Sequence, residues 1–409
     1  MKRKVVLGLM FFSLGLSHAA GCTELKNLKN YSDPAYMIHE GKNGWFLRNT
    51  DFKVNGKISA EALPYIEILS RIFNDVYGSK IYMPLIPNRS MFIDPDEYPD
   101  TAKFDRNQTF QLYRETIKQL NKIGIYADDL TLLDGEGFFF KDDHHWKTKG
   151  VQETSAMLAR SVARLKLLTE GDLEFKMIAD GKYNSDFLTG KDVNKICNSN
   201  NLPETDVKYR FEFPESIGLF DDLESNVVLV GTSYSTKPSN FPGFLQYYLK
   251  SSIENYSMDG GGAFGGLEQY LVSSSFEEKK PKLMIWEKAY YQGFGNQSSL
   301  SLLRNLVALA LGKCKSSRPA LKKELLDQLT ALNHRQKIDL FVESNVFDLK
   351  LQIKYANGNT ENLTFTRNTN TKNTGWYSTL LPAGNPVQID VTDLNGHPLQ
   401  AQVETCAIR

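Results

Sequence analysis

The stretch VVLVGTSYS, residues 227–235, carries the strongest indication of fold in the sequence. Its first four residues, Val227–Val230, are all apolar, which is typical of a parallel strand covered on both faces. Gly231 lets the chain turn, so Ser233 follows the carboxyl end of this strand, where α/β proteins place their ligands. The motif is not the GxSxG nucleophile elbow, because Ser235 replaces the last glycine. Taken alone, the pattern fits either a helix cap or a nucleophilic serine.

Strand-like and helix-like segments alternate on both sides of this stretch. Ile81–Pro87 and Ile125–Leu133 have strand character, and Leu283–Trp286 is a short, wholly apolar run. Thr109–Ile123 has the apolar spacing of an amphipathic helix. Because strands that alternate with helices indicate layered α/β architecture, we predict an α/β domain with a parallel sheet over residues 20–315.

The pattern changes after residue 315. From Ile338 onward apolar and polar residues alternate, and Asn357-Gly358 and Asn395-Gly396 are typical hairpin turns between such runs. About 90 residues remain, which is within the usual size range of a domain. We therefore predict a small β-sandwich over residues 316–409.

The N-terminus predicts export. Residues 1–19 combine the basic Lys2–Lys4, the largely apolar Val5–Leu16 and the small-x-small cleavage pattern Ser17–Ala19. The apolar stretch is shorter than the roughly 20 residues that a membrane-spanning helix needs. A cleaved signal peptide is expected, with a periplasmic mature chain that has no transmembrane segment.

Four cysteines, Cys22, Cys197, Cys314 and Cys406, fit an oxidising compartment. They allow two disulfides in three possible pairings. A domain boundary near residue 315 favours Cys22–Cys197 in the first domain and Cys314–Cys406 in the second. Lipidation of Cys22 is the competing interpretation, because the preceding residues loosely resemble a lipoprotein signal.

Composition excludes two classes of protein. With 41% hydrophobic residues, the chain can form a core, which excludes global disorder. Its 48 basic and 48 acidic residues give zero formal net charge, whereas a general nucleic-acid binder needs a basic surplus. No nucleic-acid partner is expected, although local basic patches remain compatible with this balance.

The segment DDHHW, residues 142–146, supplies partners for the serine. If it is extended, Asp143 and His145 lie on one face and His144 points away. The carboxylate could then orient the imidazole as a general base toward Ser233. The alternative is a polar loop packed around the tryptophan. Adjacent histidines do not converge on one ion without a turn, so neither a metal nor a cofactor is expected.

A glycine-rich loop spans Asp259–Gly266. It is not a P-loop, because no Gly-Lys-Ser/Thr follows. It is either a flexible connection or a place where the backbone closely approaches a ligand or an oxyanion, and Gly261 and Gly262 are the candidates for that contact.

Five segments together resemble the AlgX/AlgJ family of alginate O-acetyltransferases. They are GKNGWFLR (residues 41–48), DDHHW, VVLVGTSYS, the glycine-rich loop and PKLMIWE (residues 281–287). The resemblance covers most of residues 36–312 in matching order and spacing. It implies an SGNH-hydrolase-like domain with permuted motif order, and two disulfides in the pairing given above. It also implies a carbohydrate-binding module over residues 316–409.

The resemblance further implies ping-pong acetyl transfer onto a periplasmic exopolysaccharide, with alginate as the first guess. Ser233 would be the nucleophile, His145 the general base and Asp143 the orienting carboxylate. Within the module, Arg367 and Lys372 suit a uronate carboxylate, and Trp376 suits a sugar ring; each is otherwise a solvated loop residue or a core aromatic. Expected partners are an anionic exopolysaccharide, an acetyl donor or other acetylation proteins, and secretion-complex proteins. The chain is expected to be a monomer.

Two alternative functions stay open at this point. A carbohydrate esterase would use the same three residues with water as the acceptor. A non-catalytic scaffold that binds polymer and secretion proteins would not need the Ser233 hydroxyl.

Overall fold

The computed structural model describes residues 22–53, 57–99, 104–169, 171–213, 225–294, 297–316, 320–369 and 372–409. The predicted signal peptide, residues 1–19, lies outside these ranges. Across the ranges that are described, no helix is both long and apolar enough to cross a membrane.

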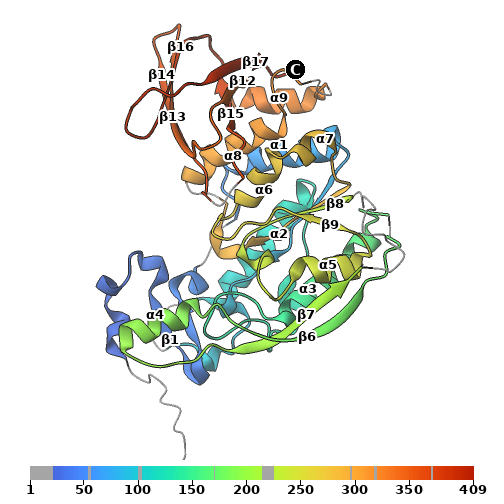
Figure 1. Ribbon diagram of the computed structural model, residues 1–409, viewed down its shortest axis with the longest axis vertical. Coiled ribbons are helices and arrows are strands. Elements are labelled where there is room, and N and C mark those ends of the chain that lie inside the picture. Colours follow the sequence, from blue (N-terminus) through green and yellow to red (C-terminus); the bar gives the residue numbers. More distant parts are fainter. Residues whose placement is uncertain are drawn as a thin grey trace, which may run out of the picture.

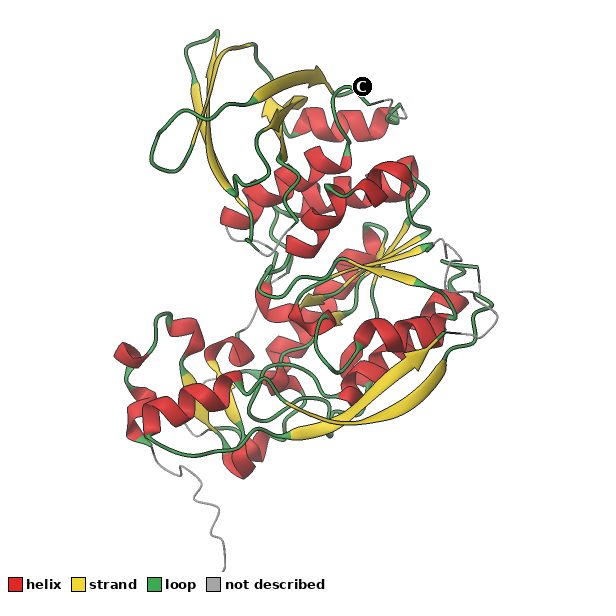
Figure 2. Ribbon diagram, in the orientation of Figure 1, coloured by secondary structure: helices red, strands yellow, loops and turns green. Residues whose placement is uncertain are grey.

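A five-stranded parallel sheet forms the centre of the larger domain (Figures 1 and 2). Its strand order is β5-β3-β10-β8-β9, and every neighbouring pair is parallel. The strands are β3 (Lys80–Tyr82), β5 (Ile125–Tyr126), β8 (Val227–Val230), β9 (Ile253–Asn255) and β10 (Leu283–Trp286). β8 and β10 are buried at all four positions, which explains why both read as uninterrupted apolar runs.

Helices cover both faces of this sheet. On one face, Val227 and Leu229 of β8 share a core with α3 (Thr148–Arg164) and α5 (Phe241–Leu249). On the other face, the alternate residues Val228 and Val230 share a core with a second set of helices. These are α1 (Leu63–Arg71), α2 (Arg106–Lys122), α6 (Gly265–Leu271) and α8 (Gln297–Ala310).

The remaining strands and helices of this domain lie around the sheet. The paired strands are β1 (Ile38–Glu40) with β2 (Phe46–Arg48), β4 (Leu85–Ile86) with β11 (Lys288–Ala289), and β6 (Lys176–Asn184) with β7 (Thr205–Glu212). The helices are α4 (Leu188–Cys197) and α7 (Ser274–Glu278).

Two predicted strands are shorter than expected. The run Ile81–Pro87 divides into β3 and β4 at Pro84, which has no N–H to donate to a ladder. The run Ile125–Leu133 is a strand only at its first two residues, because the Asp129 side chain then caps a short 3₁₀ helix, Leu130–Leu132.

The C-terminal region is a β-sandwich, as the alternating sequence predicts. One antiparallel sheet has the order β15-β12-β17 and the other β14-β13-β16. The Asn357-Gly358 turn joins β13 to β14 as predicted. The strands are β12 (His334–Phe341), β13 (Asp348–Tyr355), β14 (Thr360–Thr366), β15 (Trp376–Pro382), β16 (Pro386–Thr392) and β17 (Gln402–Ala407), and the helix α9 (Lys323–Ala331) precedes them.

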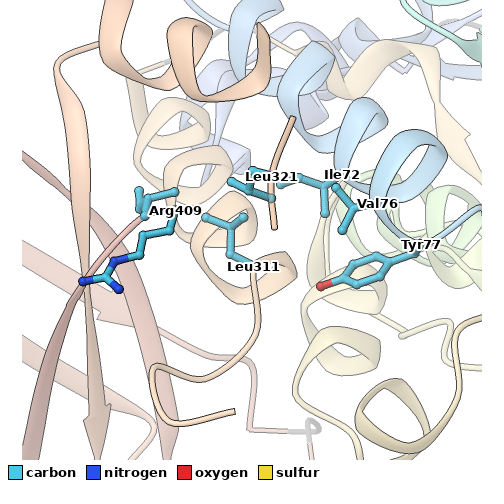
Figure 3. A pocket seen from close by; sticks show the side chains of 7 residues that line it. Ile72, Val76, Tyr77, Leu311, Leu321 and Arg409 are labelled. Carbon is cyan, nitrogen blue, oxygen red and sulfur yellow. The ribbon is translucent and has the colours of Figure 1, made fainter. Parts of the chain in front are cut away.

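The sandwich and the α/β domain share a core. Trp376 and Leu380 of β15 belong to the same buried cluster as the α1 and α8 side chains, and Arg304 of α8 donates to the Leu380 carbonyl and pairs with Glu361. Figure 3 shows a small cavity at this junction, where α1, α8 and the C-terminus meet. It is lined by Ile72, Val76, Tyr77, Leu311, Leu321, Ile408 and Arg409.

The structure confirms the favoured cysteine pairing. Cys22 is bonded to Cys197 at the end of α4, and Cys314 to Cys406 on β17. The second bond joins the chain just after α8 to the last strand. The sulfur of Cys22 is already bonded, which contradicts the lipidation interpretation.

Candidate active site

Ser233 lies where the apolar run predicts, at the carboxyl end of β8. The chain leaves the strand through Gly231 and enters a short 3₁₀ helix, Ser233–Ser235. The Thr232 side chain accepts a hydrogen bond from the Tyr234 amide, as an N-cap residue does. The cap is therefore Thr232, and the Ser233 hydroxyl stays available for another partner.

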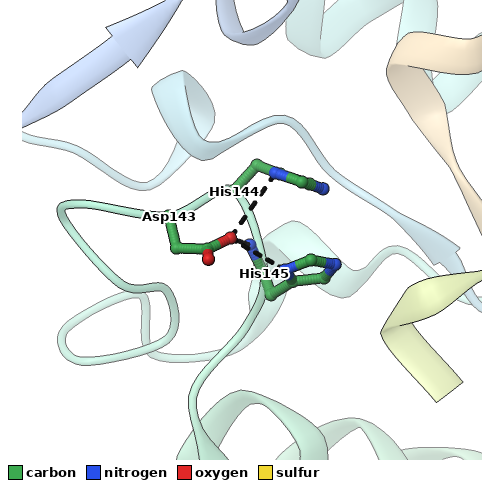
Figure 4. Close-up of side chains that lie close together, drawn as sticks. All are labelled: Asp143, His144 and His145. Carbon is green, nitrogen blue, oxygen red and sulfur yellow. Dashed lines mark hydrogen bonds and ion pairs between the residues drawn. The ribbon is translucent and has the colours of Figure 1, made fainter. Parts of the chain in front are cut away.

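A chain of hydrogen bonds joins Ser233 to the DDHHW segment. His145 Nε2 lies 2.8 Å from Ser233 Oγ. On the other side of the ring, His145 Nδ1 lies 2.7 Å from Asp143 Oδ1 (Figure 4). Both His145 and Asp143 are buried. If Nδ1 carries the proton and donates it to the carboxylate, Nε2 is left to accept the serine hydroxyl proton. This is the arrangement that activates a serine as a nucleophile.

Electrostatics keep Asp143 ionised. Burial opposes its charge, but the hydrogen bond to His145 and the neighbouring imidazoles outweigh that effect and hold its pKa well below the usual range. A permanently charged carboxylate can orient the ring and stabilise the imidazolium that forms during catalysis.

The expected orientation of His144 is wrong. The segment bends instead of running extended, so the His144 ring lies beside that of His145, with 4.0 Å between their centroids, and its Nδ1 lies 3.5 Å from Asp143 Oδ1. Burial lowers the pKa of His144 well below its ordinary value, so its ring is a neutral neighbour.

Arg89 shapes this bend. It is 1% exposed, and its guanidinium donates to the carbonyls of Phe140 and Asp143 at 3.0 and 2.7 Å. The same group donates to the carbonyl of Phe46 and forms an ion pair with Asp51. A rigid fork with five donors can satisfy carbonyls from several loops at once. Arg89 therefore holds the Asp143–His145 segment against the N-terminal part of the domain.

Glu287 supports the serine from the neighbouring strand. It follows β10, is fully buried, and accepts hydrogen bonds from Thr232 N at 2.7 Å and from the hydroxyls of Thr232 and Ser235 at 3.0 Å each. Burial raises its pKa to about 7. Because the Thr232 amide already donates to Glu287, it is not free to stabilise an oxyanion.

A chain of ion pairs borders the histidine. Asp186 Oδ2 lies 3.9 Å from His145 Nδ1 and 2.6 Å from Lys237 Nζ, and Lys237 also pairs with Asp259 at 3.0 Å. These contacts tie the glycine-rich loop and the loop before α4 to the segment that follows Ser233.

Comparison with known proteins now identifies the family. The family described as "SGNH hydrolase-like domain, acetyltransferase AlgX" matches residues 38–290, which include the sheet and all three residues of the hydrogen-bonded chain. This chain belongs to the AlgX family.

Individual relatives agree with this assignment. The Azotobacter vinelandii "Alginate biosynthesis protein AlgX" is 26% identical over 367 residues, covering 84% of this chain and 76% of that protein. The Pseudomonas syringae pv. tomato "Probable alginate O-acetylase AlgJ" is 30% identical over 282 residues, covering 64% and 69%. The solved structure of Pseudomonas aeruginosa AlgX, 20% identical, matches with a TM-score of 0.80 over 95% of this chain and 99% of that one. The AlgX fold therefore extends through the C-terminal sandwich.

The AlgX-like glycine-rich loop lies against the serine turn, but through a different glycine from those predicted. A Cβ at Gly266 would lie 2.6 Å from the carbonyl oxygen of Gly231 and 2.7 Å from its nitrogen, so only glycine fits there. At Gly261 a Cβ would meet Met258, and at Gly262 it would meet nothing within 4 Å. Ligand contact by Gly261 and Gly262 stays a prediction.

Two predicted polysaccharide-binding residues are buried. Trp376 is 2% exposed and packs in the shared core, so its ring cannot present a face to a sugar. Arg367 is 3% exposed, and its guanidinium donates to Glu268 at 2.9 Å and to the Trp376 carbonyl. Their burial contradicts the predicted role: both hold the sandwich to the α/β domain. Lys372 is exposed, and its binding role stays a prediction.

The site also contains a set of metal-ligand types. Asp143, His144 and His145 each offer one ligand atom, all within 4.8 Å of one another. Both nitrogens of His145 are already in hydrogen bonds, to Asp143 and Ser233, so an ion at this ring would have to replace one of them. The expected lack of a metal stays a prediction.

The sequence analysis missed three supporting residues: Arg89, Glu287 and Lys237. Glu287 had a usable signal, because it directly follows the wholly apolar β10 and lies at the same sheet edge as Ser233. Arg89 and Lys237 had none, since their partners come from segments far away in the sequence.

Proposed function

We propose that this protein is a periplasmic O-acetyltransferase that moves an acetyl group through acetyl-Ser233 onto hydroxyls of an anionic exopolysaccharide, alginate in the first instance. The observation that carries the proposal is the hydrogen-bonded chain from Asp143 through His145 to Ser233 at the carboxyl end of β8. The relatives' names, which include alginate biosynthesis and alginate O-acetylase, support the choice of polymer and reaction.

The reaction proceeds in two balanced steps. Ser233 Oγ attacks the carbonyl carbon of an acetyl ester donor while its proton moves to His145 Nε2, and the departing alcohol takes that proton. A polymer hydroxyl then gives its proton to His145 as its oxygen attacks acetyl-Ser233, and the proton returns to the serine. Asp143 stabilises the imidazolium in both steps. Positioning must favour the polymer hydroxyl over water.

The test compares the mature protein with Ser233→Ala and with Ser235→Ala. Ser235 lies in the same short helix, but its hydroxyl bonds to Glu287 instead of His145, so it is a matched control. With a chromogenic acetyl ester, we expect turnover and an acetyl-enzyme in intact mass for the wild type and neither for Ser233→Ala. Ser235→Ala should keep both, with turnover lowered only as far as loss of its bond to Glu287 shifts the turn. Equal turnover by Ser233→Ala would refute the assigned nucleophile and favour the scaffold.

Acceptor analysis separates transferase from esterase. Adding oligomannuronate should divert acetyl groups from water to the sugar, which mass spectrometry of the oligomer would detect. Release of acetate alone, at every oligomer concentration, would make the protein an esterase.

A further inference from the structure

A basic groove lies at the amino ends of the parallel strands, which is the edge of the sheet opposite Ser233. Lys80 begins β3, Asn226 immediately precedes β8 and Lys282 immediately precedes β10, and all three line the groove. Its volume is about 600 Å³, a size typical of ligand sites. The length of β8 separates it from the proposed catalytic serine.

The charge of this groove is strongly unbalanced. Among the described residues, its lining contains four lysines (Lys80, Lys166, Lys250 and Lys282) and one acidic residue, Asp172. Since the whole chain has zero formal net charge, this excess is local. Such a concentration of one sign in a concave surface attracts ligands of the opposite charge.

Three of these lysines have no competing side-chain partner. Among the described residues, no side-chain ion pair or hydrogen bond involves Lys80, Lys166 or Lys282, unlike Lys237 at the catalytic edge, which has two carboxylates. Backbone bonds fix two of the three side by side, because Lys80 N donates to the carbonyl of Lys282 at 2.8 Å. The two residues are therefore neighbours on adjacent strands, and both line the groove, where an external anion can reach them.

The other lining residues suit a sugar. Thr169, Ser251 and Ser252 contribute hydroxyl groups, and Leu167 and Leu168 contribute apolar surface. A polyuronate offers one carboxylate per sugar, with hydroxyls between them. Repeated carboxylates match lysines placed side by side, and the hydroxyls match the polar lining.

We propose that this lysine groove binds a stretch of anionic polysaccharide of the polyuronate class. The inference rests on the proposed function for its choice of polymer, and it supplies a binding surface that the buried Trp376 and Arg367 do not. A long polymer held here keeps its other segments near Ser233, because a second attachment raises the local concentration of the chain.

The test uses full-length mature protein and a fluorescent mannuronate oligomer. The groove variant replaces Lys80, Lys166 and Lys282 with glutamine, and the control variant replaces the exposed Lys118, Lys122 and Lys195, giving the same change in charge. We expect the groove variant to lose at least about fivefold in affinity at low salt. The control should bind as the wild type does, and added salt should weaken wild-type binding.

Small-substrate turnover separates this proposal from the proposed function. The groove variant should hydrolyse a chromogenic acetyl ester at the wild-type rate, which also shows that it is folded, while its apparent KM for polymer acetylation rises. If the wild type transfers no acetyl group, the proposed function is wrong. The difference in oligomer affinity between the wild type and the groove variant would still test binding at the groove. Unchanged affinity in the groove variant, an equal loss in the control variant, or equally tight binding of a DNA oligomer of the same charge would each overturn the proposal.

Discussion

The central strands of the parallel sheet differ from β13 of the C-terminal sandwich in which of their residues are exposed. β8 and β10 are buried along their whole length. Only the residues that flank these strands can contact a ligand, and polar side chains gather there. In β13, buried and exposed positions alternate, and Lys350 and Lys354 face outward. We infer that substitutions at the strand ends of the sheet change function, whereas substitutions in the sandwich change stability.

The largest effect is expected from His145→Ala, at the carboxyl edge of the sheet. Loss of the proposed base should lower ester turnover by about 10⁴-fold or more. His397→Ala is the matched control, since that exposed histidine of the sandwich pairs only locally with Asp393. Steady-state kinetics of both variants checks the prediction, and a His145→Ala enzyme within about tenfold of the wild type would contradict the proposed mechanism.

Removing the Cys314–Cys406 bond should affect stability instead. The bond spans 92 residues, and opening a loop of that size costs about 4 kcal/mol in free energy of unfolding. Urea unfolding of the Cys314→Ser, Cys406→Ser double variant measures this cost. The corresponding Cys22, Cys197 variant should lose a similar amount, because stabilisation depends weakly on loop length. A cost below about 1 kcal/mol would show that the sandwich does not depend on its disulfide.

Glu287→Gln tests whether the hydrogen bonds of Glu287 to Thr232 and Ser235 hold the turn that carries Ser233. An amide keeps the size of the side chain and one acceptor oxygen, but its NH₂ group cannot accept, so the three donors Thr232 N, Thr232 Oγ1 and Ser235 Oγ share one acceptor instead of two. The serine turn should shift slightly and turnover fall about 10- to 100-fold, mainly through kcat. Glu343→Gln, at an exposed position of the sandwich, should change nothing. Wild-type kcat in Glu287→Gln would show that Glu287 is structurally dispensable for Ser233.

The smallest effect is a pH dependence at the junction of the two regions. His334 bonds to Tyr65 of α1, and burial lowers its pKa to about 4, below the ordinary value of about 6.5. As pH falls from about 6.5 to about 4, His334 binds a proton in the unfolded chain but stays neutral in the folded chain. The free energy of unfolding therefore decreases. His334→Gln should lack this component. Equal pH slopes for both proteins in urea unfolding between pH 7 and pH 4.5 would contradict it.

The sequence predicted the parts whose signals are local. β8 and β10 could be predicted because a strand buried on both faces must be apolar throughout. Asp143, His145 and Ser233 could be identified as candidate partners because each lies in a distinctive short motif. The burial of Trp376 and Arg367 in the sandwich could not be predicted, since the sequence around them is the same whether a side chain faces solvent or packs against another domain. The bend that places His144 beside His145 depends on Arg89, whose carbonyl partners no periodicity reveals.

The shared core between α8 and β15 bears on how such proteins can diversify. A domain that is joined to its neighbour only by a linker can be replaced by another domain through recombination. Here a replacement would expose the apolar face of α8 to water and remove the Leu380 carbonyl that accepts a hydrogen bond from Arg304. The strand that faces α8 and the helix itself therefore need complementary surfaces, so a change of side-chain size in one calls for a matching change in the other.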